Sequence, residues 1–149
     1  MFKLFVLFIF SVVVFAKEII GIHEYINFED LDSTKFIAKI DTGAKTSSMH
    51  IEDIKVIDDK NIQIKITPKS AWKNFKISRI THVKSSNGIS HQRYYIFTFV
   101  KIGNKSYNLE FNLNNRSNMK YPVLLGRNFL ENRFLVDVSK EYLLNFDEQ

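Results

Sequence analysis

The residue that most directly suggests chemistry in this sequence is an aspartate at the end of an apolar run. Residues 37–44 read Ile-Ala-Lys-Ile-Asp-Thr-Gly-Ala, so Asp41 closes an expected strand and opens a turn. Two carboxylates that share a proton can hydrolyse a peptide bond, because one takes a proton from the attacking water while the other protonates the carbonyl oxygen. Asp41 is therefore a candidate for one carboxylate of such a pair.

The three residues after Asp41 suit the task of holding a carboxylate in place. The Thr42 hydroxyl can brace the arrangement by hydrogen bonding, and Gly43 lets backbone N–H groups approach with no side chain in between. Ala44 completes this catalytic-turn support. In ordinary loops, however, an aspartate in the same triplet only caps the turn after a strand. Taken alone, the triplet leaves both interpretations open.

A second informative segment covers residues 121–130, which read Tyr-Pro-Val-Leu-Leu-Gly-Arg-Asn-Phe-Leu. Leu124 and Leu125 precede Gly126, and a stretch without strand-like alternation follows. Together the two segments resemble those of retropepsins, the dimeric aspartic proteases of retroviruses. The second signature of retropepsins is a hydrophobic-hydrophobic-Gly segment, often followed by Arg-Asn, that packs beside the catalytic turn.

The resemblance is closer to a bacterial retropepsin-like family whose members have long been called ATP-dependent zinc proteases and often lie near ATP-grasp ligases. The similar segments are residues 39–48, 83–88 and 116–127, with Arg93 between them, in the family's order. This resemblance implies that Asp41 is the catalytic carboxylate of an aspartic endopeptidase. It also implies that the second signature packs beside the Asp41 turn.

The chain contains a single Asp-Thr-Gly triplet, whereas the chemistry requires two equivalent carboxylates. A symmetric dimer would place Asp41 against its copy across a two-fold axis. We therefore expect a homodimer that acts on a peptide substrate. The paired carboxylates should titrate as one unit and give a bell-shaped dependence of activity on pH.

Two groups of residues are candidates for substrate binding. Four arginines fall in or near the family-like segments, and their guanidinium groups suit carboxylates: Arg79, Arg93, Arg116 and Arg127. In the cleft they would favour acidic or glutamate-rich peptides, as the family's association with glutamate-adding ligases suggests, but they could instead brace the barrel or the dimer. The second group is Ser86, Asn87 and Gly88. By its position in the family pattern, the resemblance implies that this hairpin is a flap over the substrate.

The elements that must position these residues are mainly strands. Alternation with period two, rich in β-branched and aromatic residues, marks residues 62–66, 95–100 and 107–113. Asn87-Gly88 is the preferred centre of a type I′ hairpin turn. Residues 127–132 predict one short helix before a strand at 134–138. The expected fold is all-β, a closed barrel of the retropepsin-like type with one short helix near the C-terminus.

The first sixteen residues predict a secretory signal peptide. Lys3 gives a positive start, residues 4–15 form an apolar run, and the segment ends in small residues at Ala16. The run is too short for a transmembrane helix, which needs roughly 20 residues. We expect residues 1–16 to be the signal and 17–149 to be one protease domain, exported to the periplasm of a two-membrane bacterium. Membrane attachment is expected only through an uncleaved signal.

Composition excludes several other classes. The sequence has no cysteine, so thiol catalysis and thiolate metal sites are ruled out. The net charge of +5 is spread along the chain without a basic stripe, so no nucleic-acid partner is expected. No phosphate-binding loop occurs, and no cofactor is expected. His23-Glu24 begins like a zinc-binding helix motif, but Asn27 occupies the place of its second histidine, so no metal site is expected.

Two alternative functions remain open from the sequence. The first is a non-catalytic peptide-binding module on the same barrel, with Asp41 structural and recognition by strand addition. The second is a zinc-dependent hydrolase, which requires three histidines to converge on an open metal position. The candidates for that role are His23, His50, His82 and His91.

Overall fold

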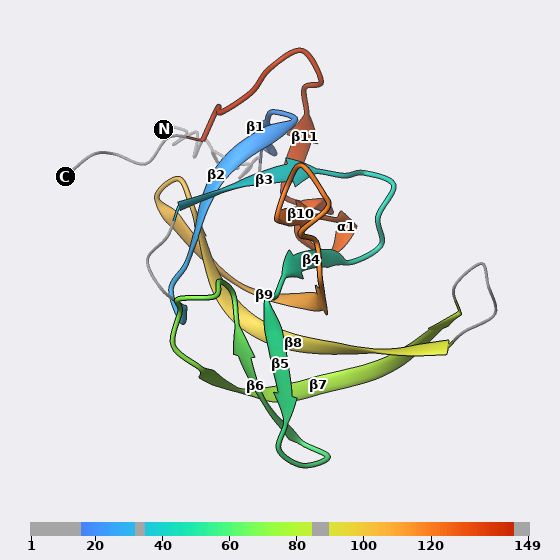
Figure 1. Cartoon of the computed structure of the whole chain (residues 1–149). Coiled ribbons are helices and arrows are strands. Elements are labelled where there is room, and N and C mark those ends of the chain that lie inside the picture. Colours follow the sequence, from blue (N-terminus) through green and yellow to red (C-terminus); the bar gives the residue numbers. More distant parts are fainter. Residues whose placement is uncertain (1–15, 32–34, 85–89, 145–149) are drawn as a thin grey trace, which may run out of the picture.

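The computed structural model describes residues 16–31, 35–84 and 90–144, and strands dominate this part of the chain (Figure 1). The only helix within these residues is α1 (Arg127–Leu130). The strands are β1 (Glu18–Ile20), β2 (His23–Phe28), β3 (Lys35–Ile40), β4 (Ser47–His50), β5 (Asp53–Val56), β6 (Asn61–Lys65), β7 (Lys73–Lys84), β8 (Ser90–Ile102), β9 (Lys105–Asn114), β10 (Val123–Leu125) and β11 (Phe134–Val136).

Six strands close into a barrel in the order β2-β3-β10-β4-β9-β8. Strand β8 returns to β2, with Ile26 opposite Ile102 and Phe28 opposite Val100. The short β10 is parallel to β3 and antiparallel to β4. Closure leaves none of these six strands as a free edge within the ring. The predicted all-β closed barrel with one short helix near the C-terminus is confirmed.

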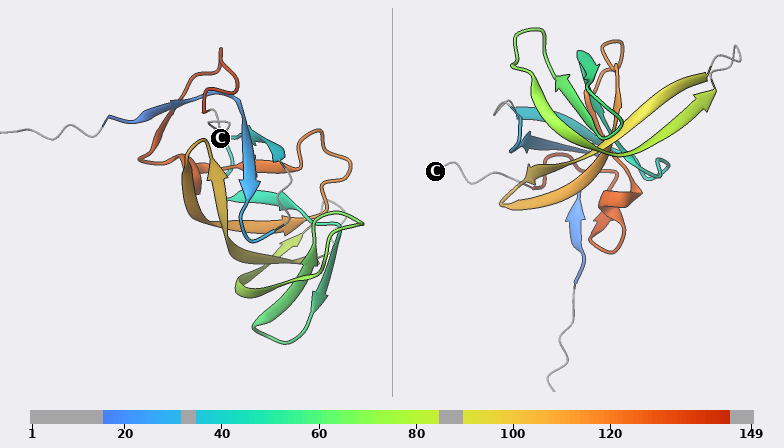
Figure 2. Two further views of the ribbon diagram at one scale, coloured as in Figure 1. Left: turned by 90° about the vertical axis from the view of Figure 1, so that its left-hand side faces the viewer. Right: turned by 90° about the horizontal axis from the view of Figure 1, so that it is seen from below.

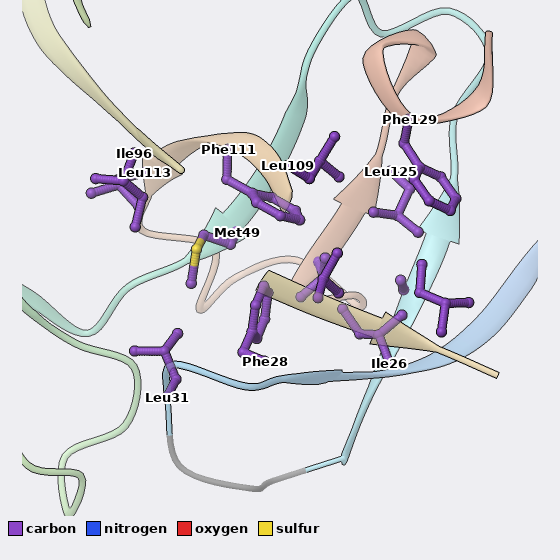
Figure 3. Packing of buried hydrophobic residues seen from close by; sticks show 14 of the residues in the cluster. Ile26, Phe28, Leu31, Met49, Ile96, Leu109, Phe111, Leu113, Leu125 and Phe129 are labelled. Atoms are coloured by element: carbon purple, nitrogen blue, oxygen red, sulfur yellow. The ribbon is translucent and has the colours of Figure 1, made fainter. Parts of the chain in front are cut away.

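Alternating side chains fill the barrel with an apolar core. Along β2 every second residue is buried, with Ile26 and Phe28 pointing inward. Phe28 meets Phe111 of β9 edge to face, with ring centroids 5.4 Å apart, and both belong to the cluster in Figure 3. Each large apolar side chain buried in this way contributes roughly 1.5–3 kcal/mol. The core is therefore a rigid support for the loops at the barrel ends.

Strands β7 and β8 continue beyond the barrel as a long two-stranded arm, which projects from the body in Figures 1 and 2. Their pairing extends to Lys84 opposite Ser90. The arms of the predicted hairpin are thus present, whereas its turn residues Ser86, Asn87 and Gly88 lie outside the described residues. On the other side of β7, the sheet continues through β6 to β5.

Residues 1–15 also lie outside the described residues, so the signal peptide and the exported location stay predictions. In the part of the chain that the structure describes, no helix is long and apolar enough to cross a membrane. Strand β1, which follows at Glu18, pairs in parallel with β11 to form a separate two-stranded sheet.

A buried carboxylate fastens the chain's C-terminal segment to the barrel. Glu24 of β2 is fully buried and accepts three backbone hydrogen bonds. The donors are the N–H groups of Gly21 at 3.0 Å, Leu143 at 3.1 Å and Leu144 at 3.0 Å. Tyr142 adds a contact by stacking on another β2 side chain, Tyr25, at 4.6 Å. Glu24 is therefore a structural residue here.

We predict that Glu24→Ala lowers the free energy of unfolding by about 3 kcal/mol or more. The change removes the charged acceptor of three N–H groups, and each unsatisfied buried donor costs about 1–3 kcal/mol. Urea unfolding measures the loss. Asp59→Ala, in the exposed turn between β5 and β6, is the matched control and should change stability little. Equal losses in the two variants would show that Glu24 is not an anchor.

Candidate active site

The barrel itself fixes the position of Asp41. This residue follows the last residue of β3, Ile40, which lies beside Leu125 of β10 in the parallel pair. The Asp41 N–H donates to the Leu125 carbonyl at 2.9 Å, so the ladder extends one residue past the strand. The two signature segments recognised in the sequence are therefore adjacent strands of one sheet.

The turn after Asp41 holds its carboxylate in a defined orientation. Oδ1 accepts hydrogen bonds from the N–H groups of Gly43 at 3.0 Å and Ala44 at 3.1 Å. A Cβ on residue 43 would stand 3.3 Å from Oδ1, which makes glycine the best fit there. Asp41 is half-buried, and Oδ2 makes no hydrogen bond within the described residues. One carboxylate oxygen is thus held while the other remains available for a proton or water.

Thr42 takes part in the turn through its backbone. Its side chain is exposed, and within the described residues its hydroxyl makes no hydrogen bond. Its carbonyl accepts a bond from Arg127 Nη1 at 3.3 Å, and the Gly43 carbonyl accepts another from the same atom at 3.3 Å. Arg127 therefore ties the outside of the turn to the start of α1.

Gly126 allows the second signature to approach the turn after Asp41 closely. A Cβ at this position would lie 2.8 Å from the Ala44 carbonyl oxygen and 2.8 Å from the Thr46 carbonyl carbon, so any larger residue would force the backbones apart. The next residue exploits this proximity, since the Arg127 N–H donates to the Ala44 carbonyl at 2.8 Å. The glycine is required by close packing.

Two polar side chains that sequence reasoning did not single out complete the junction. Asn128 Oδ1 accepts from the N–H of Ser47 at 2.8 Å and from its hydroxyl at 2.7 Å, and Asn128 Nδ2 donates to the Glu110 carbonyl at 2.8 Å. Ser47 Oγ in turn accepts from the Gly126 N–H at 3.0 Å. Asn128 could have been found from the sequence, because it belongs to the Arg-Asn pair that often follows the glycine of the second signature. Nothing comparable marked Ser47.

The four candidate arginines fall into two pairs, and the first is engaged in structural contacts. Arg79 donates hydrogen bonds from Nε and Nη2 to the Glu110 carboxylate at 3.0–3.1 Å. Its Cζ lies over the Tyr95 ring, 3.5 Å from the ring centroid. The hydrogen bonds that Arg79 donates to the Glu110 carboxylate raise the pKa of Arg79 above its usual value. Arg127 braces the turn as described. Both also line a cavity of about 590 Å³ between the catalytic turn and the β7–β9 strands, together with Lys45.

Within the described residues, neither Arg93 nor Arg116, the second pair, forms an ion pair with a carboxylate. Arg116 is half-buried, and desolvation lowers its pKa, with Asp41 opposing this shift and Arg93 reinforcing it. The Arg116 guanidinium is therefore close enough to Asp41, and to Arg93, to interact electrostatically with each of them. An anionic ligand placed between the two guanidinium groups would relieve their mutual repulsion.

The histidines do not form a metal site within the described residues. No group of three or more His, Asp or Glu side chains there is arranged to hold an ion. His23 pairs with Glu141 at 3.0 Å and stacks on Tyr121, and His50 contacts the Arg116 backbone. These side chains have structural partners in separate places. The donor set does not fit the zinc hydrolase alternative.

Comparison with known proteins identifies several similar sequences and folds. A family model described as the retropepsin-like aspartic endopeptidase RimB matches residues 19–147. Two curated relatives named probable alpha-L-glutamate ligase are 32% identical over 137 residues, in Shewanella pealeana, and 31% identical over 144 residues, in Desulfotalea psychrophila. These matches cover 86% and 87% of this chain but 30% of each relative. The chain therefore spans less than a third of the curated relatives' length.

A solved structure shares the fold. It is a Legionella pneumophila protein of unknown function, with a TM-score of 0.73 and 24% sequence identity. The match covers 87% of this chain and 100% of that one. At this level of identity, the likeness supports the barrel architecture alone.

We predict that Asn128→Leu lowers the free energy of unfolding by about 2–4 kcal/mol, because it leaves the Ser47 N–H and the Glu110 carbonyl without their partners. Thermal and urea unfolding measure the change. The matched control is Asn118→Leu, in the exposed loop between β9 and β10. The interpretation of Asn128 as the junction's central side chain is wrong if both variants lose the same stability.

Proposed function

The chain belongs to the RimB-like family of retropepsin-like aspartic endopeptidases, and from that premise we propose that it hydrolyses peptide bonds as a homodimer. The family name is that of a hydrolytic enzyme. The observation that carries the proposal is the orientation of Asp41, whose Oδ1 is held by two backbone N–H groups at the end of a barrel strand. Capping a turn requires only the local N–H groups, whereas here the second signature also packs against the Asp41 turn.

In the proposed reaction, Asp41 of each chain contributes one carboxyl group to a pair that holds one proton. The ionised carboxylate removes a proton from water, and the water oxygen attacks the peptide carbonyl carbon. The protonated partner gives its proton to the carbonyl oxygen. When the tetrahedral diol breaks down, the protonated carboxyl gives its proton to the leaving nitrogen, the ionised carboxylate takes a proton from a diol hydroxyl, and the C–N bond is cleaved. The pair again holds one proton.

We propose that the substrate is an acidic or glutamate-rich peptide. Arg116 supports this idea, because it interacts electrostatically with Asp41 and forms no ion pair with a carboxylate among the described residues. Arg93 adds a second positive charge close to Arg116. Arg presents a planar fork suited to carboxylates. The relatives' name, probable alpha-L-glutamate ligase, belongs to proteins in which a segment similar to this chain is 30% of the length. That name is compatible with a glutamate-containing substrate here.

The proposed dimer needs a surface close to the catalytic turn, and the β1–β11 sheet supplies a candidate. Ile19 and Leu135 are neighbours in this sheet and are 53% and 57% exposed. Val138, just after β11, is 77% exposed. The cavity beside the sheet has a volume of about 340 Å³ and is lined by Phe134 and by Thr42 of the catalytic turn. Burying these apolar side chains against a second copy would favour association.

We predict that Asp41→Asn lowers peptidase activity at least about a thousandfold, because acid and base catalysis contribute roughly 10²–10⁴ to the rate. The measurement is cleavage of glutamate-containing peptides across pH, where the unmodified chain should give a bell-shaped profile. The exposed Asp59→Asn is the control and should remain active. Cleavage at equal rates by both variants, or cleavage that a chelator abolishes, would exclude the carboxylate mechanism. Peptide binding without any cleavage would indicate the non-catalytic module.

We also predict that Leu135→Asp raises the dimer dissociation constant at least about tenfold, since a charge would replace an apolar contact at the interface. Sedimentation velocity measures this constant, and the lost activity should return at higher protein concentration. Phe97→Asp is the matched control, because Phe97 lies on β8 and is 54% exposed. If the Phe97 variant alone dissociates, the interface lies elsewhere on the barrel.

A further inference from the structure

His50 connects both ends of the loop between β9 and β10. It is the last residue of β4, which lies between those two strands in the barrel. The His50 N–H donates to the Pro122 carbonyl at 2.8 Å, just before β10 begins. The imidazole Nδ1 accepts from the Arg116 N–H at 2.9 Å, just after β9 ends. One residue thus fixes where the loop leaves the barrel and where it returns.

The loop that His50 fastens carries Arg116, whose guanidinium interacts electrostatically with Asp41. The Arg116 Nε donates to the Tyr121 carbonyl at 3.2 Å, which folds the side chain back across its own loop. Asp41 and Arg93 both act on the charge of this guanidinium. The position of the guanidinium therefore depends on a backbone whose first anchor is the imidazole of His50.

The contact defines which form of the imidazole is compatible with the loop. Because Nδ1 accepts a hydrogen bond from an N–H group, the ring is neutral and carries its proton on Nε2. Nε2 faces Glu52 Oε2 at 3.7 Å, on the exposed side of the ring. If Nδ1 also carried a proton, its N–H would point at the Arg116 N–H, and the hydrogen bond between them would be lost. The function of Nδ1 here is that of an acceptor, which other side chains can also provide.

We propose that His50 is a positioning residue for substrate selection. Its Nδ1 holds the loop of residues 115–122, and with it the Arg116 side chain that is bonded to the Tyr121 carbonyl, so that the guanidinium binds a carboxylate side chain of the peptide. This inference rests on the proposed peptidase function. It assigns to His50 a role that neither catalysis nor metal binding requires.

Two substitutions separate the acceptor from the rest of the side chain. His50→Asn places an amide oxygen close to the position of Nδ1, whereas His50→Leu fills similar space without an acceptor. The readout is the ratio of kcat/KM for an alternating Glu-Ala peptide to that for the matched Gln-Ala peptide. We expect His50→Leu to reduce this ratio about tenfold, since a charge-assisted contact is lost, and His50→Asn to keep most of it. A purely structural role would lower kcat/KM for both peptides equally and leave the ratio unchanged, which would overturn the proposal.

A second comparison tests whether His50 acts through Arg116. In an Arg116→Met background, His50→Leu should cause no further loss of the Glu-Ala preference, because the side chain that it positions is already absent. A further tenfold loss in that background would mean that His50 acts by another route, and the proposal would be wrong.

Two readouts keep this test independent of catalysis. Amide hydrogen exchange at Arg116 should be slow in the unmodified chain and in His50→Asn, and fast in His50→Leu. Calorimetric binding of the Glu-Ala peptide to Asp41→Asn protein should weaken about tenfold when His50→Leu is added. If no variant cleaves peptides yet both effects appear, the peptidase proposal fails and the positioning role stands. If cleavage depends on Asp41 but neither effect appears, only the positioning role fails.

Discussion

The close approach of the Gly126 backbone to the turn at residues 44–46 is the constraint on which the rest of the site depends. At this point the end of strand β10, the start of α1 and the turn after Asp41 lie so close together that an added Cβ would not fit. The approach is held by hydrogen bonds on both sides, from the Asp41 N–H to the Leu125 carbonyl and from the Arg127 N–H to the Ala44 carbonyl. Because the barrel is closed and its core is packed, the turn has little freedom to move, and the Asp41 carboxylate inherits that rigidity.

Three polar side chains, Asn128, Glu24 and His50, each make several hydrogen bonds that fix one segment outside the sheet. Asn128 uses both ends of its amide to join α1 to β4 and β9. Glu24 uses both of its oxygens to hold the C-terminal segment. His50 contacts both ends of the loop before β10. Buried polar groups are costly when unpaired, so such fully paired side chains specify one arrangement of the loops. The apolar core closes the barrel, and these few polar residues decide how its loops are placed.

The arginines differ in whether a carboxylate of the chain neutralises them, and this difference separates a structural role from a proposed role in recognition. Arg79 is neutralised by Glu110 and stacked on an aromatic ring, which makes it part of the wall of a cavity. Among the described residues, Arg116 has the Tyr121 carbonyl and the charge of Asp41 to compensate its desolvation, whereas the positive charge of Arg93 adds to the cost. A half-buried guanidinium without a carboxylate partner is costly unless something else supplies the negative charge. That difference is the physical basis for expecting an acidic ligand on one side of the turn.

The sequence by itself determined the fold class and placed Asp41 in a turn at the end of a strand, because strand alternation, the triplet at Asp41 and the glycine at 126 are local patterns with direct steric causes. It also predicted that the two signatures would meet. It could not sort the four arginines, since their roles depend on partners such as Glu110 that lie on other strands. Nor could it identify Ser47 or the role of His50, whose hydrogen bonds cross 81 and 66 residues of sequence. Those choices were made by the tertiary structure, because closing the barrel is what brings distant donors and acceptors within reach of one another.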